Sequence, residues 1–421
     1  MKLINKTIGE VADVIAGQSP PSNLYNKTGN GLPFYQGKTD FGEKYPEAKT
    51  WCIGAKNKEA IKNDILLSVR APVGPVNICQ VRSVIGRGLS AIRAKKGNSF
   101  EYLFYYLKNH EQDIAKLGTG STFKAITQTH INRIQLPIPE SFDDQIRIAT
   151  VLTRAERLIA KRKEIIKALD ALLMSTFLEM FGDPVRNEKG WNKKTLKSFG
   201  QIITGNTPSR NNDDNYSSKF IEWIKTDNIV AAQIYITVAN EFLSETGLQK
   251  ARFVTSGALL VACIAGSVES IGRAAITDRK VSFNQQINAI QPNEEINSLF
   301  LYWLFNISKL YIQSHATKGM KKILTKGDFE KILMIKPPLP LQNQFAAIVE
   351  KVESIKVKQA QSLAELENLY VSLSQRAFKG ELDLSGVAVG DAPETEPRQI
   401  MDETRRAFTK NGLNLQTSLA T

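Results

Sequence analysis

Two long stretches of the chain place apolar residues at a repeating spacing of four and three positions. In residues 143–181 this seam consists of Ile148, Leu152, Ile159, Arg162, Ile166, Leu169 and Leu173. In residues 344–378 it consists of Ile348, Val352, Ile355, Gln359, Leu366, Leu369 and Leu373. Such a spacing is typical of helices that pack along a partner helix. Because prolines precede and a glycine follows each stretch, and both residue types stop helices, we predict two long helices that pair with each other.

The segments that precede the two predicted helices carry similar motifs in the same order. Residues 17–20 (GQSP) match residues 205–208 (GNTP) at an offset of 188 (205 − 17), and the triplet KTD occurs at both Lys38 and Lys225. Further matches join 65–67 to 258–260, 91–92 to 289–290 and 137–139 to 338–340, the last at an offset of 201 (338 − 137). Both segments mix short strand-like runs with a core helix, which is typical of α/β or α+β domains. The shared order therefore predicts a tandem repeat.

The repeat divides the chain into two α/β (α+β) domains, two long helices and a tail. We predict the first domain in residues 1–140 and its helix in 141–184, the second domain in 185–340 and its helix in 341–380, and an acidic tail in 381–421. Both helix seams become polar near their middles. We therefore expect Arg162 within hydrogen-bonding reach of Gln359 or Ser362, the alternative being that Arg162 extends to solvent along its stem.

Composition and charge favour a folded chain with a polyanionic partner. The 421 residues are 42% hydrophobic, which is enough to build cores. The 55 Lys and Arg exceed the 42 Asp and Glu by 13, a balance that favours nucleic acid, the alternative being a basic protein without such a partner. The three scattered cysteines fit a reducing cytoplasm and predict neither a disulfide framework nor a zinc site. Because the chain has no signal peptide and no apolar run that could span a membrane, we expect a cytoplasmic protein without membrane contact.

Four features together resemble the specificity (S) subunits of type I restriction–modification systems. They are the G-x-S/T-P loops at Gly17 and Gly205, the KTD triplets, the prolines and glutamine that open each long helix (Gln145 and Gln344), and the helix endings MFGDP and AFKGEL. The resemblance covers residues 4–382. The opening in this family is usually Glu-Gln, whereas this chain has Asp144-Gln145 and Asn343-Gln344.

The resemblance implies a non-catalytic DNA-recognition subunit. Members of the family carry two target-recognition domains, each reading one half of a bipartite DNA target. Their two long helices form an antiparallel coiled coil with pseudo-two-fold symmetry. Members position two methyltransferase (modification) subunits and, through them, restriction/translocase subunits. S-adenosylmethionine, ATP and Mg²⁺ are then expected in those partner subunits, with no cofactor in this chain.

The candidate DNA-binding residues lie mostly in the matched loops and combine basic with short hydrogen-bonding side chains. Lys and Arg can contact guanine or phosphate, amide side chains read adenine, and Asp accepts from cytosine. In the first domain the candidates are Ser19, Tyr35, Gln36, Lys38, Thr39, Asp40, Arg70, Thr119, Ser121, Thr122 and Lys124. In the second domain they are Asn206, Thr207, Ser209, Arg210, Lys225, Thr226, Asp227, Asn228, Arg273, Lys318, Lys321 and Lys322. The alternatives are capping turns, polar strand edges and solvated loops.

The sequence offers no candidate catalytic or metal-binding residues. It has no glycine-rich cofactor loop after a strand, no GxxxxGK[ST] loop, and no Pro-Pro turn followed by an aromatic residue that could stack a flipped base. Its three histidines lack metal-ligand spacing. The rival hypotheses are a coiled-coil scaffold whose globular domains bind proteins rather than DNA, and an enzyme that acts on DNA by itself, which the missing motifs disfavour.

Overall fold

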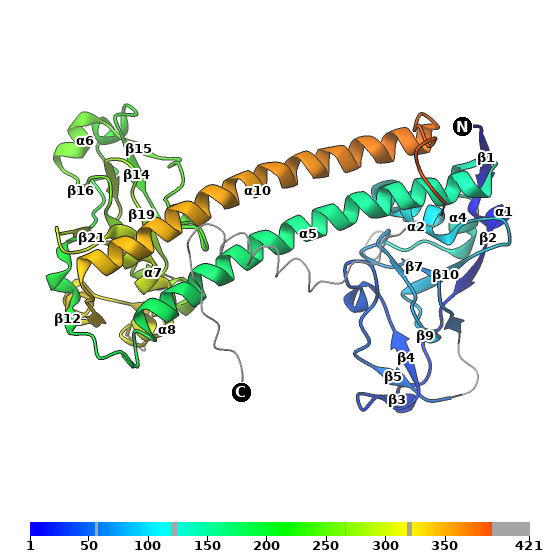
Figure 1. The fold of residues 1–421 in the computed structure, drawn as a ribbon, viewed down its shortest axis with the longest axis horizontal. Helices are drawn as coiled ribbons and strands as arrows, with labels where there is room; N and C mark the ends of the chain where they lie inside the picture. Colours follow the sequence, from blue (N-terminus) through cyan, green and yellow to red (C-terminus); the bar gives the residue numbers. More distant parts are fainter. Residues whose placement is uncertain (55–57, 119–123, 266, 318–321, 390–421) are drawn as a thin grey trace. The chain divides into compact units, whose positions relative to one another are not determined.

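The chain forms two compact units that share two long helices. The computed structural model describes residues 1–54, 58–118, 124–265, 267–317 and 322–389. The first unit comprises residues 1–161 and the described residues from 363 onward, and the second comprises residues 162–362. The long helices, α5 (Phe142–Phe181) and α10 (Leu339–Lys379), each contribute one part to either unit (Figure 1). Each unit thus combines one predicted domain with parts of both long helices.

The first unit contains two sheets and a two-stranded ribbon. The four-stranded sheet is antiparallel and has the order β2-β10-β7-β8, with β2 (Ala12–Ala16), β10 (Leu89–Ala94), β7 (Ile65–Ser68) and β8 (Val76–Ile78). The five-stranded sheet is mixed and has the order β3-β5-β4-β9-β6, with β3 (Tyr25–Asn26), β5 (Trp51–Cys52), β4 (Leu32–Tyr35), β9 (Ser83–Ile85) and β6 (Glu59–Ala60). The ribbon pairs β1 (Leu3–Thr7) with β11 (Gln135–Pro139).

The second unit repeats these sheets, with one strand fewer in the mixed sheet and one additional ribbon. Its antiparallel sheet has the order β13-β21-β17-β19, with β13 (Gly200–Thr204), β21 (Ile287–Pro292), β17 (Leu259–Ala262) and β19 (Ala274–Ile276). Its mixed sheet has the order β15-β14-β20-β16, with β15 (Phe242–Leu243), β14 (Ile221–Ile224), β20 (Val281–Phe283) and β16 (Phe253–Val254). Two ribbons pair β12 (Lys193–Thr195) with β23 (Leu333–Ile335) and β18 (Ile264–Ala265) with β22 (Lys322–Ile323).

Strand register gives the spacing of the repeat directly. Ile92 of β10 faces Val14 and Ile65, and Ile290 of β21 faces Ile202 and Leu259. The offset is therefore 188 (202 − 14) at the first strand, 194 (259 − 65) at the third and 198 (290 − 92) at the central strand. Ten residues are therefore inserted by the central strand (198 − 188), whereas the predicted offsets of 188 and 201 imply thirteen, and residue 65 matches 259 instead of 258.

The shorter helices also recur in the same order. In the first unit they are α1 (Ile8–Val11), η1 (Ser22–Leu24), η2 (Lys38–Asp40), α2 (Phe100–Asn109), α3 (Glu111–Lys116) and α4 (Gln128–Asn132). In the second they are η3 (Leu196–Ser198), η4 (Asp213–Tyr216), η5 (Thr226–Asn228), α6 (Glu245–Gln249), η6 (Val268–Ser270), α7 (Ser298–Ile307), α8 (Lys309–Ser314) and α9 (Lys326–Lys331). The helices α2 and α7 are the predicted core helices, and Ser99 and Asn297 cap their N-termini by accepting backbone hydrogen bonds.

A buried glutamine ties the start of each long helix to its domain. The amide oxygen of Gln145 accepts from the Ser99 backbone N–H at 2.8 Å, and its amide nitrogen donates to the Pro139 carbonyl at 3.0 Å. Gln342 does the same with Asn297 (2.9 Å) and Pro337 (2.8 Å). The predicted match of Gln145 to Gln344 is therefore wrong, since Gln344 is exposed and Gln342 makes the equivalent contacts.

The predicted match of 137–139 to 338–340 is also wrong. Gln145 donates to the Pro139 carbonyl where Gln342 donates to the Pro337 carbonyl, so residue 139 corresponds to 337 (337 − 139 = 198). The helix α10 begins at Leu339, two residues before the predicted start (341 − 339), because proline is tolerated in the first helical turn, where its missing N–H has no partner to lose. The glycines at the opposite ends, Gly182 and Gly380, have φ of 72° and 78°, the left-handed conformation that closes a helix.

Within the second unit the two long helices are antiparallel. The Arg162 guanidinium donates to the Gln359 side-chain oxygen, and the Lys356 ammonium lies 2.7 Å from the Asp170 carboxylate. Asp170 comes after Arg162 in α5, whereas its partner Lys356 comes before Gln359 in α10, so the two helices run in opposite directions. The expected hydrogen bond between the polar middles of the two seams is confirmed.

The apolar seam follows the prediction except near the C-terminal end of α10. The buried seam residues are Ile148, Leu152, Leu169, Leu173 and Val352. Half-buried are Ile159, Arg162, Ile166, Ile348, Ile355, Gln359, Leu366 and Leu373. Leu369 is 48% exposed, so its assignment to the seam is wrong, and its neighbour Tyr370 packs against the core instead. A helix with 3.6 residues per turn drifts about 20° per heptad from an ideal four-three seam, which explains this change of face.

Candidate nucleic-acid interface

Three backbone segments of the first unit converge at one end of its sheets. The backbone N–H groups of Gly17 and Gln18 donate to the carbonyls of Leu89 and Ile85, each at 2.9 Å. The Gly86 N–H donates to the Tyr35 carbonyl at 2.8 Å. These bonds join the G-x-S-P loop, the turn at 36–40 and the turn at 86–88, which we call the first recognition edge.

Glycine is required where these segments touch. A Cβ at Gly17 would lie 2.2 Å from the Gly86 carbonyl oxygen, and a Cβ at Gly88 would lie 2.3 Å from the Gln36 carbonyl oxygen. Both distances are far below van der Waals contact, so a larger residue would push the segments apart. The edge is therefore a closely packed platform of main chain from which the neighbouring side chains project.

The first recognition edge carries exposed basic and polar side chains. Ser19, Gln36, Lys38, Thr39 and Arg87 are exposed there, and the Ser19 hydroxyl accepts from the Arg87 N–H at 3.3 Å. Arg70 lies next to this edge, because the N–H of its neighbour Val69 donates to the Gly88 carbonyl at 2.9 Å. Arg70 also forms an antiparallel β-bridge with Ala125, the neighbour of Lys124. Lys38, Arg70 and Arg87 form no ion pair within the described residues. Because all three side chains are exposed, their charges face solvent.

Two predicted contact residues of this unit have structural roles instead. Tyr35 is 4% exposed and packs among Ala60, Leu66 and Ile85, so its ring belongs to the core. The Asp40 carboxylate accepts from the Gln36 N–H at 2.6 Å and closes the turn. Neither side chain is placed to contact a base.

The second unit builds the same platform. Gly205 and Asn206 donate to the carbonyls of Ile287 and Phe283 at 3.0 and 3.1 Å, and Asn284 donates to the Ile224 carbonyl at 3.0 Å. The Thr207 hydroxyl donates to the side chain of Gln285, the counterpart of Arg87 (285 − 87 = 198). We call this region the second recognition edge, and the predicted match between the two G-x-S/T-P loops is confirmed.

The two KTD triplets are displaced by one residue in space. The Asn228 side-chain oxygen accepts from the Lys225 N–H at 3.0 Å and closes the second turn as Asp40 closes the first. Asn228 is 5% exposed, and its amide nitrogen donates to Thr237 and to the Val238 carbonyl, each at 3.1 Å. Its predicted DNA contact is therefore wrong, and the spatial counterpart of Lys38 is Thr226.

The basic side chains of the second edge are held by a carboxylate. Lys225 and Arg210 both form ion pairs with Glu241. The Arg210 guanidinium lies 4.5 Å from the Tyr216 ring and 5.0 Å from the Trp223 ring, and the Lys225 ammonium lies 5.2 Å from Trp223. The hydrogen bond from Lys225, followed by that from Arg210, lowers the pKa of Glu241. At neutral pH this cluster is one anion shared by two cations.

Two further candidates of the second unit are engaged within the chain. The Asn206 side chain accepts from the Arg252 N–H at 2.8 Å and donates to the Lys250 carbonyl at 2.7 Å, and Arg273 donates to the Ser270 hydroxyl. The remaining candidates of this unit lie at the surface, namely Thr207, Ser209, Thr226 and Asp227.

Five candidates from the two units lie outside the described residues, namely Thr119, Ser121, Thr122, Lys318 and Lys321. Lys322 is the first residue of β22.

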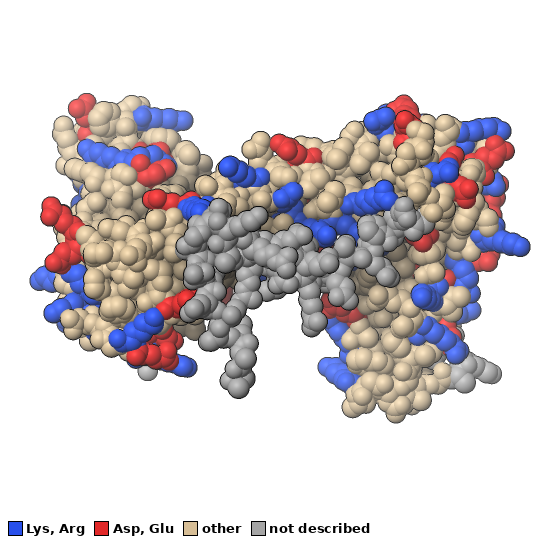
Figure 2. Space-filling model, in the orientation of Figure 1, with Lys and Arg blue, Asp and Glu red and all other residues tan. Residues whose placement is uncertain are grey.

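Sequence reasoning missed Arg87, Gln285 and Glu241. The pair Gly86 and Gly88 on either side of Arg87 was the available signal, because paired glycines mark a close main-chain approach. Charge was no guide, since Lys and Arg side chains are interspersed with Asp and Glu over the face of both units shown in Figure 2.

A comparison with known proteins identifies the family. The profile described as "Type I restriction modification DNA specificity domain" matches residues 3–171 and 188–368. This chain belongs to that family. Membership implies DNA and the other components of a restriction–modification system as partners, and specificity subunits are the non-catalytic component of such systems.

Individual relatives carry the same description. The putative type I restriction enzyme MjaX specificity subunit of Methanocaldococcus jannaschii is 44% identical over 153 residues, which is 36% of this chain and 36% of that protein. The MjaIX specificity subunit of the same organism is 23% identical over 415 residues, covering 90% of this chain and 93% of that protein. The HindI specificity subunit of Haemophilus influenzae is 30% identical over 203 residues, covering 46% and 42%.

Solved structures share the fold. The S subunit of a type I system from M. genitalium has a TM-score of 0.56 at 15% identity, covering 90% of this chain and 96% of that one. A structure described in terms of complex assembly and conformational transition of the type I system has a TM-score of 0.59 at 16% identity, covering 90% and 98%. Among the described residues, no helix has the length and apolarity needed to cross a membrane.

Proposed function

We propose that this specificity subunit reads a bipartite DNA target, with each recognition edge contacting one half-site. The observation that supports this proposal is that similar main-chain scaffolds carry different side chains. The first edge presents Lys38 and Arg87 where the second presents Thr226 and Gln285. Different donors and acceptors on equal platforms are suited to reading different sequences.

Partners and cofactors follow from the same proposal. The subunit positions two methyltransferase subunits and, through them, the restriction/translocase subunits, in the cytoplasm. Those partners bind S-adenosylmethionine, ATP and Mg²⁺. The Lys and Arg side chains that face solvent at the first edge would contact phosphates and orient the duplex, while the shorter polar side chains would contact base edges.

An exchange of domains tests the bipartite reading. Residues 185–340 are replaced by the equivalent segment of another specificity subunit, and methylated sites are mapped in DNA from cells that express the complete system. One half-site should change while the other is kept. The reciprocal exchange of residues 1–140 should change the other half-site. A change of both half-sites in either chimera would contradict the proposal.

Salt dependence separates this function from a protein-binding scaffold. If the edges contact phosphates, the logarithm of the DNA association constant falls linearly with the logarithm of the salt concentration, with a slope of about −0.9 per phosphate contact. A scaffold that binds proteins would show negligible DNA affinity at low salt as well as at high salt.

A further inference from the structure

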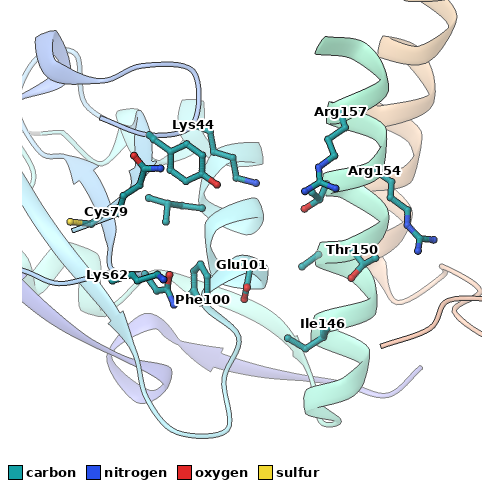
Figure 3. A pocket seen from close by; sticks show the side chains of 15 residues that line it. Lys44, Lys62, Cys79, Phe100, Glu101, Ile146, Thr150, Arg154 and Arg157 are labelled. Carbon is teal, nitrogen blue, oxygen red and sulfur yellow. The ribbon is translucent and has the colours of Figure 1, made fainter. Parts of the chain in front are cut away.

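A cavity of about 440 Å³ in the first unit lies between the sheets and the first part of α5. Figure 3 shows Lys44 and Arg157 extending toward each other across this space, with Glu101 below them. The charged residues that line the cavity are four cations and one carboxylate, namely Lys44, Lys62, Arg154, Arg157 and Glu101. The carboxylate accepts from the Ser99 hydroxyl at 2.7 Å. Basic side chains therefore predominate among the charged residues of the lining.

Lys44 is held in this cavity by aromatic side chains. Its ammonium lies 5.7 Å from the Phe104 ring and 5.5 Å from the Tyr105 ring, and it donates to the Tyr105 hydroxyl at 3.4 Å. Burial lowers the pKa of Lys44; among the surrounding charges, the Glu156 carboxylate raises it, and the cations Lys108 and Arg157 lower it. An anion bound beside Lys44 would stabilise the charged form of this partly buried ammonium.

The second unit shows that the fold does not require a positive cavity. The Ile78 N–H donates to the Lys44 carbonyl at 2.9 Å, and the Ile276 N–H donates to the Ile234 carbonyl at 2.7 Å. Tyr45, which lines the cavity, therefore corresponds to Tyr235. Around Tyr235 the charges are reversed, since its pKa is raised first by burial and then by the carboxylates Glu350, Asp278 and Glu353.

We propose that this cavity binds a small ligand that bears phosphate groups. Its volume lies in the range of about 300–1,000 Å³ that is usual for small-molecule sites. A DNA duplex does not fit into such a volume, whereas a phosphate ester does. An arginine fork donates two parallel hydrogen bonds to phosphate oxygens, and lysines add charge without fixed geometry. The site is separate from the recognition edges and does not rest on the function proposed for them.

Direct binding of pyrophosphate to the full-length chain tests the proposal. Equilibrium dialysis at low salt compares the native protein with the double variant Lys62→Gln/Arg157→Gln, whose two side chains are exposed at the cavity and can be replaced without disturbing the core. The matched control Lys167→Gln/Lys358→Gln removes two exposed charges from the long helices in the second unit. Thermal unfolding of all three proteins verifies that they are folded.

The native chain should bind one equivalent of pyrophosphate. The cavity variant should have a Kd at least about tenfold higher, because two charge-assisted contacts are lost, while the control variant stays within about twofold. Absence of saturable binding up to millimolar pyrophosphate would overturn the proposal. An equal loss of affinity in the control variant would also overturn it, since binding would then reflect diffuse charge.

A second arm distinguishes a free phosphate ester from the phosphates of DNA. A short duplex without the target site is added in excess over the protein. Binding of pyrophosphate with unchanged stoichiometry supports a small ligand. Displacement of pyrophosphate by the duplex, together with weaker duplex binding by the cavity variant, would assign the site to the DNA backbone and refute the small-ligand proposal.

Discussion

Glu241 should restrain the DNA affinity of the second recognition edge, and its substitution by glutamine tests this. In the native chain the carboxylate forms ion pairs with both Lys225 and Arg210, so neither charge faces an incoming phosphate alone. Glu241→Gln keeps the size of the side chain and removes its charge. The two cations stay over the Trp223 ring and become available to DNA.

The size of the effect follows from counterion release. Two additional phosphate contacts make the slope of log K against log salt steeper by about 1.8. Between 50 and 200 mM salt, the ratio of variant to native affinity should then fall by about twelvefold, with the variant binding more tightly at the lower salt. The cost to folding is small, about 1 kcal/mol or less, because the ion pairs are partly exposed.

Fluorescence anisotropy with a non-specific duplex at several salt concentrations measures this slope. The control variant Glu245→Gln removes an exposed carboxylate of the same unit that takes part in no ion pair within the described residues. It should leave the slope within about 0.3 of the native value. If Glu241→Gln gives the native slope, or if both variants change it equally, then Glu241 does not restrain the two cations.

Three further predictions concern charge and register. Lys38→Ala should reduce the salt slope by about one, because its ammonium forms no ion pair in the described chain and is available to a phosphate; Kd measurements on DNA containing the first half-site verify this. Arg162→Leu combined with Gln359→Leu should raise the free energy of unfolding by about 1 kcal/mol, since an apolar pair replaces a polar layer, as measured by urea unfolding. Glu222→Gln should cost about 2 kcal/mol at pH 7, because the carboxylate accepts two hydrogen bonds from Arg279 at 2.7 Å each; thermal unfolding from pH 7 to pH 3 tests it.

The sign of the pH dependence follows from the direction of the pKa shift. The hydrogen bonds from Arg279 lower the pKa of Glu222 in the folded protein. A depressed carboxylate pKa stabilises the fold above the unfolded pKa, and this stabilisation is lost as the pH falls through the folded pKa. The difference between native and Glu222→Gln proteins should therefore start to narrow as the pH falls below about 4.3, the pKa of an unfolded glutamate, and should narrow further as the pH falls through the lower folded pKa. A constant difference down to pH 3 would show that the variant loses packing and not charge.

The sequence predicted the long helices well because their signals are local. An apolar spacing, prolines before the helix and glycines after it each act within a few residues, and the polar middles of both seams identified the Arg162–Gln359 contact. The face of α10 near Leu369 was missed because the drift of a 3.6-residue helix accumulates over several turns. Gln342, the equivalent of Gln145, was missed because its partner Asn297, which caps α7, lies 45 residues earlier in the sequence (342 − 297). A contact over that distance depends on the three-dimensional fold and has no local signal.

At the recognition edges, sequence matching succeeded for main-chain requirements and failed for side-chain partners. Gly17 and Gly205 were found because only glycine tolerates a carbonyl oxygen 2.2 Å from the position of a Cβ. The KTD match was misplaced because the turn is closed by Asp40 in one unit and by Asn228 in the other, and identical letters hide that change of register. Glu241 carried no signal beside Lys225, since 16 residues separate the two in sequence.

The two edges together explain how one fold could read two unrelated half-sites. The bonds that hold each platform run between main-chain atoms, such as Gly17 N–H to Leu89 O and Gly205 N–H to Ile287 O. Any side chain that leaves these bonds intact is compatible with the fold, so the residues of this turn can differ between the units without loss of structure. Arg87 in one unit and Gln285 in the other illustrate this freedom. Substituting an exposed position should therefore alter DNA affinity with little change in stability, whereas a larger residue at Gly17 should lower both.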